Sequence, residues 1–297
     1  MRNWSNAAEP RQQPLREKVA PPKAWFSRPA YRFCAAATSA GFLLFALTAA
    51  RAADLERIDL RYEMFGVAGI HVATNRTAVE ETADQYAITA DVESRGIAAL
   101  FVDLTSHSEV LGRLTIDGAR PEAYRGKVRR NGVESRNRVN YAADGTIAGE
   151  AMPPDETRTP VAPPLMRGTV DQLTAFFMVE RRLAHRGSCA LVVAVYDGRR
   201  RYDLHFTDAA PEVPRAFAER NGVGATQVCR MRRQAIAGFA DANGRSEGAY
   251  EGKLWYARLL PGDLMVPVEM EFSTEFGTVT GQLAELNGRG IHLRFEE

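Results

Sequence analysis

The sequence has little cysteine, no excess of either charge and only one long apolar run. Three cysteines in 297 residues exclude a small disulfide-dense scaffold. One apolar run is too few for a polytopic membrane protein. The composition, 45% hydrophobic and 25% charged, is that of a globular protein long enough to bury a sizeable core.

The net charge of +1 hides an uneven distribution along the chain. Residues 1–52 carry eight Lys and Arg against two Asp and Glu, which leaves 30 against 35, a net charge of −5, for residues 53–297. A body of that charge has no basic footprint for duplex DNA or RNA. We therefore expect no nucleic-acid partner.

The first 52 residues have the order of a secretory signal. Arg28 and Arg32 precede an uncharged apolar run of sixteen residues, 35–50, and small residues at 50 and 52 flank a cleavage site between Ala52 and Ala53. The alternative is a membrane anchor, but sixteen residues fall short of the roughly 20 that span a bilayer. The sequence predicts export to the periplasm, with no membrane span after cleavage.

The predicted organisation is a leader and signal peptide, 1–52, followed by one exported β-rich domain, 53–297. Cleavage removes Cys34 and leaves Cys189 and Cys229, an even pair in an oxidising compartment. A disulfide between them is the simplest outcome. Two free thiols in a redox pair are the alternative, although the chain has no C-x-x-C motif and no metal-type cysteine spacing.

The pattern of residues 53–297 predicts a series of β-hairpins. Seven Asp-Gly or Asn-Gly pairs, which tolerate the positive φ angles of tight turns, separate segments in which apolar and polar residues alternate. In 266–273, for example, Val266, Val268, Met270 and Phe272 share one face. The pattern predicts strands at 57–65, 69–80, 85–94, 104–116, 121–130, 133–142, 145–151, 190–196, 199–207, 226–236, 250–260, 264–273, 276–286 and 290–295.

Two segments interrupt the hairpins. Five prolines in 153–164 predict an extended linker. The next segment, 170–185, has the apolar stripe of an amphipathic helix, with Thr169 as its N-cap and Gly187 as its end. A shorter helix is expected at 97–102. The predicted fold is mainly β: a large curved antiparallel sheet, an open or half barrel or β-spiral, with one amphipathic helix packed on its concave face.

Known catalytic and metal-binding signatures are lacking. The chain has no G-x-S-x-G, H-E-x-x-H, Walker A or EF-hand motif, and its five histidines are dispersed. We expect no enzyme activity, no metal and no cofactor. A hydrolase that uses two scattered carboxylates stays open, and a concave pair with raised pKa values would favour it.

The densest polar cluster is the hairpin tip at 196–203. Arg200 lies on the face that Tyr202 shares with apolar residues. There it either extends its charged end to solvent or pairs with a carboxylate on a neighbouring strand, or it binds an anionic head group at the mouth of a cavity. Large side chains are expected on the inner faces of the helix and the late strands. They either fill a packed core or line a ligand cavity; the candidate ligand-binding residues are Arg200, Tyr202, Phe176, Phe177 and Trp255.

Five segments of the chain stand out together: Leu60-Arg61-Tyr62-Glu63-Met64-Phe65-Gly66-Val67, Gly168-x-x-Asp171, Tyr196-Asp197-Gly198-Arg199-Arg200-Arg201-Tyr202-Asp203-Leu204, Ile236-Ala237-Gly238-Phe239 and Phe276-Gly277-Thr278-Val279. With these segments the chain resembles an exported proteobacterial family, the domain of unknown function 3108. The resemblance covers about 57–287. It implies a β-rich spiral or half-barrel fold akin to periplasmic lipoprotein carriers and envelope-integrity proteins, a cysteine pair at 189 and 229, and no agreed activity.

Two functions compete. The first is a non-enzymatic periplasmic protein of the cell envelope that binds or carries a lipid or other amphiphile between sheet and helix. The second is a structural or interaction factor for envelope integrity, which contacts an envelope protein and holds no small ligand. A space between helix and sheet that is filled by side chains would count against the first.

Overall fold

The computed structural model describes most of the chain after the leader. The described residues are 55–116, 118–155, 157–210, 221–224, 226–240, 248–262, 264–274 and 277–295. Contacts divide the chain into Met1–Ala50 and Arg51–Glu297, and every described residue belongs to the second unit. The predicted cleavage site, Ala52 and Ala53, lies outside the described residues.

All fourteen predicted strands are present, with ends that differ from the predicted ones by at most three residues. The strands are β1 Glu56–Phe65, β2 His71–Glu81, β3 Gln85–Ser94, β4 Leu104–Thr115, β5 Gly118–Arg130, β6 Val133–Tyr141, β7 Ile147–Met152, β8 Leu191–Tyr196, β9 Arg201–Asp208, β10 Gln227–Ala237, β11 Glu251–Ala257, β12 Val266–Thr274, β13 Gly277–Gly288 and β14 Ile291–Arg294.

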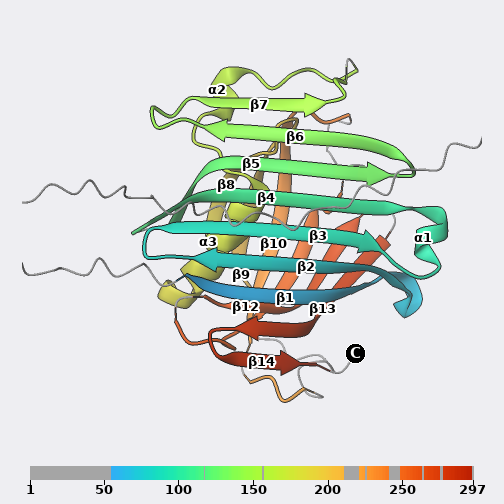
Figure 1. The fold of residues 1–297 in the computed structure, drawn as a ribbon, viewed down its shortest axis with the longest axis vertical. Coiled ribbons are helices and arrows are strands. Elements are labelled where there is room, and N and C mark those ends of the chain that lie inside the picture. The colour runs from blue at the N-terminus through green and yellow to red at the C-terminus, as the bar shows by residue number, and fades with distance from the viewer. Residues whose placement is uncertain are drawn as a thin grey trace, which may run out of the picture. The chain divides into compact units, whose positions relative to one another are not determined.

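The strands form one antiparallel sheet made of two meanders (Figure 1). Its order is β7-β6-β5-β4-β3-β2-β1-β13-β12-β11-β10-β9-β8, with β14 paired to β13. Every neighbour on this path is also a neighbour in sequence except β1 and β13, whose pairing joins the first meander to the second. The outer strands β7 and β8 do not pair with each other, so the sheet is open, as predicted.

Alternation explains why these segments are strands. In β1, Ile58, Leu60 and Tyr62 are buried, whereas Asp59 and Arg61 between them are on the other face. The tight turn between β5 and β6 has Asn131 at φ 50° and Gly132 at φ 81°. Two consecutive positive φ angles define the hairpin turn that Asn-Gly favours, so this pair fixes the register of β5 on β6.

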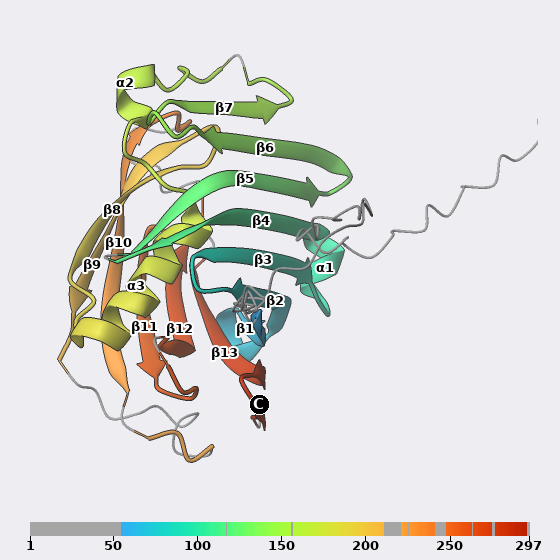
Figure 2. The same ribbon diagram turned by 60° about the vertical axis from the view of Figure 1, so that its left-hand side comes forward.

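The long helix, α3 Gln172–Arg186, lies inside the curve of the sheet (Figure 2). It touches β4, β5 and β8, and it buries Phe177, Val179 and Leu183 among its inward residues. Gly187, at φ 63°, ends the helix as predicted. The predicted N-cap is wrong: the cap is Asp171, whose side chain accepts from the Thr174 N–H, while the Thr169 hydroxyl donates to the Met166 carbonyl.

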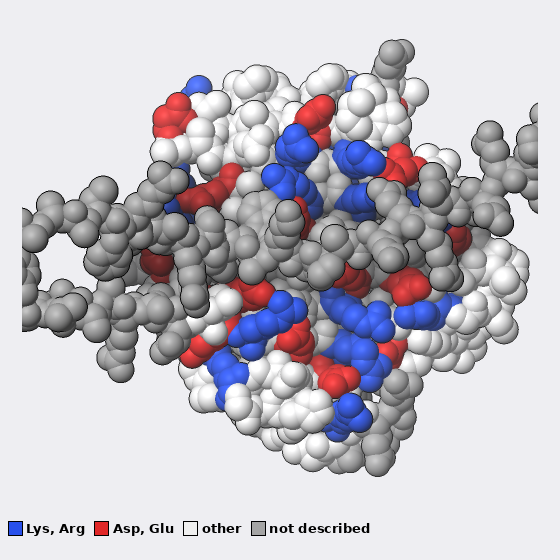
Figure 3. Space-filling model, viewed as in Figure 1, with Lys and Arg blue, Asp and Glu red and all other residues white. Residues whose placement is uncertain are grey.

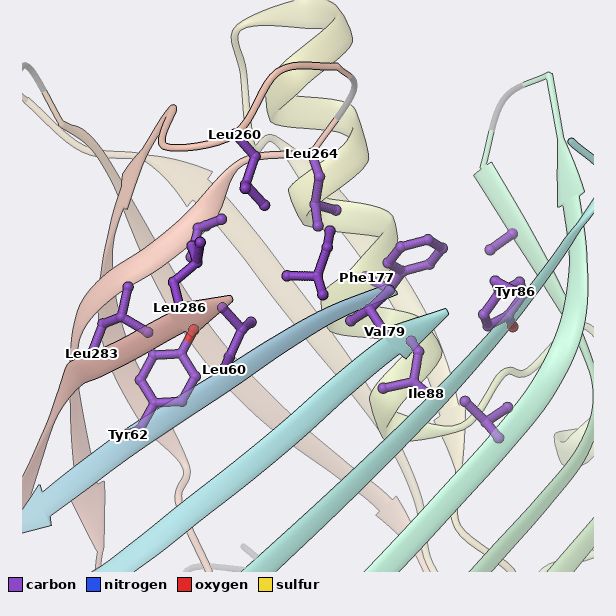
Figure 4. Close-up of a cluster of buried hydrophobic side chains, with 14 of the residues drawn as sticks. Leu60, Tyr62, Val79, Tyr86, Ile88, Phe177, Leu260, Leu264, Leu283 and Leu286 are labelled. Atoms are coloured by element: carbon purple, nitrogen blue, oxygen red, sulfur yellow. The ribbon is translucent and has the colours of Figure 1, made fainter. Parts of the chain in front are cut away.

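The core fills the space between the helix and the inner face of the sheet (Figure 4). Phe177 and Tyr86 stack with ring centroids 5.0 Å apart, and Leu60, Leu283 and Leu286 pack in the same cluster. A second cluster joins the other side of α3 to β8–β12. The interior is therefore close-packed, with aromatic and branched side chains from both meanders.

Three short helical turns complete the described fold. The predicted helix at 97–102 is α1 Ala98–Phe101, and η1 Val67–Gly69 connects β1 to β2. The Pro-rich linker is extended only in part, because its end forms α2 Pro163–Met166. Proline is tolerated there since the first turn of a helix leaves its N–H groups unbonded anyway.

Candidate functional site at the start of the buried helix

A buried chain of hydrogen bonds links the start of α3 to β3. The Tyr86 hydroxyl donates to Thr174 Oγ1 over 2.7 Å, and Thr174 Oγ1 donates to Asp171 Oδ2 over 2.6 Å. Asp171 Oδ1 accepts from the Thr174 N–H at 2.9 Å. All three residues are fully buried. The Asp171 carboxyl therefore caps the helix and is also the end of a polar path that crosses the interior.

Burial dominates the protonation of this cluster. Desolvation raises the pKa of Asp171 to about 6, although its hydrogen bonds to Thr174 favour the carboxylate. Burial likewise raises the pKa of Tyr86 and of Tyr141, far above the usual range. The Tyr141 hydroxyl is buried without a hydrogen-bond partner in the described structure. The tyrosines thus stay neutral, and Asp171 is the group here that titrates near neutral pH.

Arg200 forms an ion pair, but with Asp197 of its own turn and not with a neighbouring strand. Its Nη2 lies 2.7 Å and its Nε 2.9 Å from Asp197 Oδ2, and its guanidinium lies 5.7 Å from the ring centroid of Phe239. Asp197 Oδ1 also accepts from the backbone N–H of Arg199 and of Arg200. Arg200 therefore braces the turn between β8 and β9, where Asp197 is the shared acceptor.

Tyr202 lies on the inner face of β9, two residues beyond Arg200. Its hydroxyl donates to Gln172 Oε1 at 3.2 Å, and its ring meets that of Phe239 edge-on at 6.1 Å. Arg233 stacks over both rings, at 5.8 Å and 5.2 Å. The structure thus brings Arg200 and Tyr202 together around Phe239, a residue that the sequence analysis did not single out as a ligand contact.

Phe176 and Phe177 point to different parts of the core. Phe177 stacks on Tyr86 of β3, whereas Phe176 meets Phe206 of β9 edge-on at 5.7 Å. Each ring already has an aromatic partner in the interior. Neither side chain lines the grooves over β9–β12, over β4–β7, or over β13 and β1–β3.

Trp255 is not on the inner face, which corrects the prediction. It pairs with Val228 and Glu269, and it shares its face of β11 with Lys253, whose Nζ lies 5.4 Å from the indole centroid. Leu254 and Tyr256, on the other face, belong to the cluster that packs against α3. The five candidate ligand residues therefore do not surround one cavity.

A second acidic cluster lies near the middle of α3. Desolvation and the neighbouring charge of Glu81 raise the pKa of Glu180 to about 8. Glu81 itself is ion-paired with Arg181 at 3.4 Å and with Arg289 at 3.6 Å. These groups tie α3 to β2 and to the turn after β13.

The two carboxyls of α3 with raised pKa values, Asp171 and Glu180, do not form a catalytic pair. Nine residues separate them, which places them about 14 Å apart along the helix axis and on opposite faces. Neither lines a groove formed by the described residues. This arrangement gives no support to the carboxylate-hydrolase alternative, which needs two carboxyls facing one bond.

Cys189 and Cys229 form a disulfide, with Cα atoms 6.1 Å apart, that joins the start of β8 to β10 beneath α3.

Within the described residues no group of three His, Cys, Asp or Glu side chains has the arrangement of a metal site. In the same part of the chain no helix is long and apolar enough to cross a membrane.

Grooves are present on the outer face of the sheet. One of about 550 Å³ is lined by residues of β9–β12, and another of about 400 Å³ crosses β4–β7. Over the outer face of the first meander, which Figure 3 shows, basic and acidic side chains are interspersed, in ion pairs such as Arg125–Glu109 at 3.0 Å. Exposed pairs of this kind contribute little to stability.

Comparison with known proteins gives a family and a solved structure that is similar. Residues 61–284 match the model of the family described as "Protein of unknown function (DUF3108)". The chain belongs to this DUF3108 family. A crystal structure of a β-barrel-like protein of the domain of unknown function DUF1849 from Brucella abortus is similar at 13% identity and a TM-score of 0.47, over 80% of this chain and 99% of that one. No curated protein matches the sequence.

The DUF3108 region contains every element of the candidate site. Asp171, Arg200, Cys189 and Cys229 all lie within the matched residues. The family assignment confirms the resemblance inferred from the sequence. The predicted sheet with a helix on its concave face is confirmed by the structure itself.

Proposed function

We propose that this chain is a non-enzymatic interaction protein of the bacterial cell envelope that is exported to the periplasm and makes its contacts through its outer surface. One observation carries the proposal. The side chains expected to line a ligand cavity, Phe176 and Phe177 among them, pack against other core rings. A carrier of an amphiphile would need the volume that these rings occupy.

The signal-like leader supports the export part of the proposal. Basic residues, an uncharged run and small residues at 50 and 52 stand in the order that the secretion machinery recognises. The Cys189–Cys229 disulfide fits an oxidising compartment. The amphiphile carrier stays as the alternative, and a ligand bound in the folded protein would favour it.

Cell fractionation with N-terminal sequencing tests the export. The protein is produced with its own leader, and we expect it in the periplasmic fraction with Ala53 as its first residue. A matched variant, Ala52→Tyr, should slow cleavage because the signal site needs a small side chain there. Recovery of the wild-type protein in the cytoplasm with the leader intact would overturn the proposal.

Site-directed photocrosslinking in intact cells tests the outer-surface part. A photoreactive residue replaces Arg138 or Arg230, each in a groove of the outer face, or Ile116 in the turn after β4 as the control. We expect discrete adducts with envelope proteins or peptidoglycan from the groove positions and not from the turn. Equal, diffuse labelling from all three positions would contradict a defined contact surface.

A further inference from the structure

Large apolar side chains stand out to solvent at one end of the sheet. They belong to the connection between β1 and β2 and to the connection between β3 and β4, which contains α1. The exposed fractions of these side chains run from 49% to 83%. Exposed apolar side chains on a protein surface usually stand singly and not in groups. We call these five residues the apolar rim: Val67, Ile70, Ile97, Leu100 and Phe101.

The two connections lie side by side. The last pair of the β2–β3 ladder is Ala73 with Ser94, and beyond it the Arg95 N–H donates to the Val72 carbonyl at 2.9 Å. α1 packs against β2. Figure 1 shows η1 and α1 at the same side of the sheet, on the right of the view. The five apolar side chains therefore form one patch and not two.

The β1–β2 connection has a defined conformation. The Gly66 N–H donates to the Ile70 carbonyl at 2.8 Å, and Ala68 stands at φ 56° between Val67 and Ile70. An alanine in the left-handed region is strained, and such strain persists only where neighbouring contacts impose it. The exposure of Val67 and Ile70 is thus a property of a closed turn.

A buried carboxylate anchors the base of this turn. Glu63 Oε2 contacts Thr74 Oγ1 and His71 Nε2, each at 2.7 Å, and Glu63 also pairs with Arg61. His71 is the first residue of β2, directly after the turn. These bonds fix both strands at the point where the apolar turn leaves the sheet.

Basic residues border the apolar rim. The β5–β6 turn is joined to the end of the α1 connection, since Asn131 and Asp103 exchange two hydrogen bonds of 2.8 Å and 2.9 Å. In segments 93–103 and 127–136, five Lys and Arg stand against three Asp and Glu. Four of those basic residues pair locally: Arg95 with Glu93, Arg129 with Asp103, and both Lys127 and Arg136 with Glu134. The border is net positive although residues 53–297 are net negative.

We propose that the apolar rim inserts into the surface of a lipid bilayer with anionic headgroups. Apolar side chains at the tip with basic residues behind them match an acyl region below a layer of negative charge. The rim exposes on the order of 400 Å² of apolar surface, a patch large enough to mark a contact site. A symmetric contact between two copies of this chain would bring two net positive borders together, so a second copy fits less well. The inference rests on the rim alone and goes beyond the proposed function.

A tryptophan placed in the rim reports its insertion. Leu100→Trp puts the probe in the rim, and Ile116→Trp puts it at a fully exposed apolar position in the turn between β4 and β5, at the other end of β4. Both variants of the full chain are mixed with vesicles of equimolar phosphatidylglycerol and phosphatidylcholine, or of phosphatidylcholine alone. The wild type, which contains Trp4, Trp25 and Trp255, supplies the signal to subtract from both variants, so any contribution of the leader cancels and the difference reports the added tryptophan.

For Leu100→Trp with the anionic vesicles, we expect the tryptophan emission to shift to the blue and to be quenched by brominated acyl chains. We expect neither change in the emission of Ile116→Trp. Adding Phe101→Ser to Leu100→Trp should weaken the apparent affinity by roughly tenfold, since one large buried apolar side chain is removed. Equal signals at the two positions, equal signals with both vesicle types, or a blue shift that follows protein concentration without lipid would each overturn the proposal. Failure of the fractionation test would leave this result unaffected.

Discussion

The hydroxyl of Tyr86 lies 2.7 Å from Oγ1 of Thr174, a residue 88 positions further along the chain. This bond joins β3, in the first meander, to the first turn of α3, which precedes the second meander. Both groups are buried, so neither finds water if its partner is removed. The contact is therefore one of the few polar links that hold the helix at a fixed depth in the sheet.

Tyr86→Phe should lower the free energy of unfolding by about 1 kcal/mol. The change keeps the ring that stacks on Phe177 and removes only the hydroxyl that donates to Thr174. Urea denaturation of the purified protein measures the difference. Tyr62→Phe is the matched control, because the Tyr62 hydroxyl is also buried but has no hydrogen-bond partner in the described structure.

Tyr62→Phe should leave the free energy of unfolding unchanged or raise it, since it removes a buried polar atom that forms no hydrogen bond. A loss of stability in Tyr62→Phe as large as that in Tyr86→Phe would mean that removing any buried tyrosine hydroxyl has this cost, and that the hydrogen bond to Thr174 does not set it.

Asp171→Asn should remove part of the pH dependence of stability. Burial raises the pKa of Asp171 to about 6 from its ordinary value of 3.8, so the folded protein keeps this proton at pH values where the unfolded chain has lost it. The free energy of unfolding of the wild type therefore falls as pH rises from about 4 to about 6, by up to about 3 kcal/mol. The amide does not titrate, and its oxygen still accepts from the Thr174 N–H.

Denaturation midpoints of wild type and Asp171→Asn from pH 4 to pH 8 measure this contribution. Relative to the wild type, the variant should gain stability between about pH 4 and pH 6 and keep a constant difference above that. Glu180, whose pKa is raised to about 8, is present in both proteins and cancels. A difference that is flat from pH 4 upward would show that Asp171 ionises as readily in the folded protein as in the unfolded chain.

Loss of the disulfide should cost about 4 kcal/mol. Cys189 and Cys229 are 40 residues apart, and closing a loop of that length removes entropy from the unfolded chain. The double variant Cys189→Ala, Cys229→Ala, compared with oxidised wild type in urea, gives the value. The wild type under reducing conditions should unfold at nearly the same urea concentration as the variant, and a reduced protein as stable as the oxidised one would contradict a structural role.

Asp197→Ala should destabilise the protein more than Arg200→Gln. Asp197 accepts from two backbone N–H groups of the β8–β9 turn in addition to Arg200, so its removal leaves three donors without their acceptor. We expect losses of about 2 kcal/mol and about 1 kcal/mol respectively in thermal or urea unfolding. The reverse order would indicate that Arg200 makes its main contribution elsewhere than in this turn.

The strands were predictable because their signals are local. A turn pair such as Asn131-Gly132 and the alternation of Ile58, Leu60 and Tyr62 depend only on near neighbours in sequence. The helix was predictable for the same reason, through its apolar stripe. Its cap was not, because Thr169 and Asp171 are both good capping residues and the backbone geometry decides between them.

The face of Trp255 was not predictable from alternation. Leu254, Trp255, Tyr256 and Ala257 are all apolar and all buried, so the segment has no period of two to read. A register shift in the pairing with β12 falls between Trp255 and Tyr256 and breaks the regular alternation further. Sequence alone therefore grouped Trp255 with residues from which the sheet separates it.

The candidate site was only partly predictable. The resemblance to the family singled out Asp171, and the hairpin tip singled out Arg200 and Tyr202. The partners Tyr86 and Phe239 were missed, because their contacts join segments distant in sequence. The pairing of β1 with β13, which joins the two meanders around α3, also connects segments distant in sequence and was missed for the same reason.

Native mass spectrometry of the protein, purified gently from the periplasm, tests the central claim that the interior holds no small ligand. The expected mass is that of residues 53–297 with the Cys189–Cys229 disulfide and nothing bound, because the core side chains fill the space between α3 and the sheet. A stoichiometric lipid-sized adduct that survives in wild type and in the rim variant Leu100→Ser would contradict the claim and favour the amphiphile carrier.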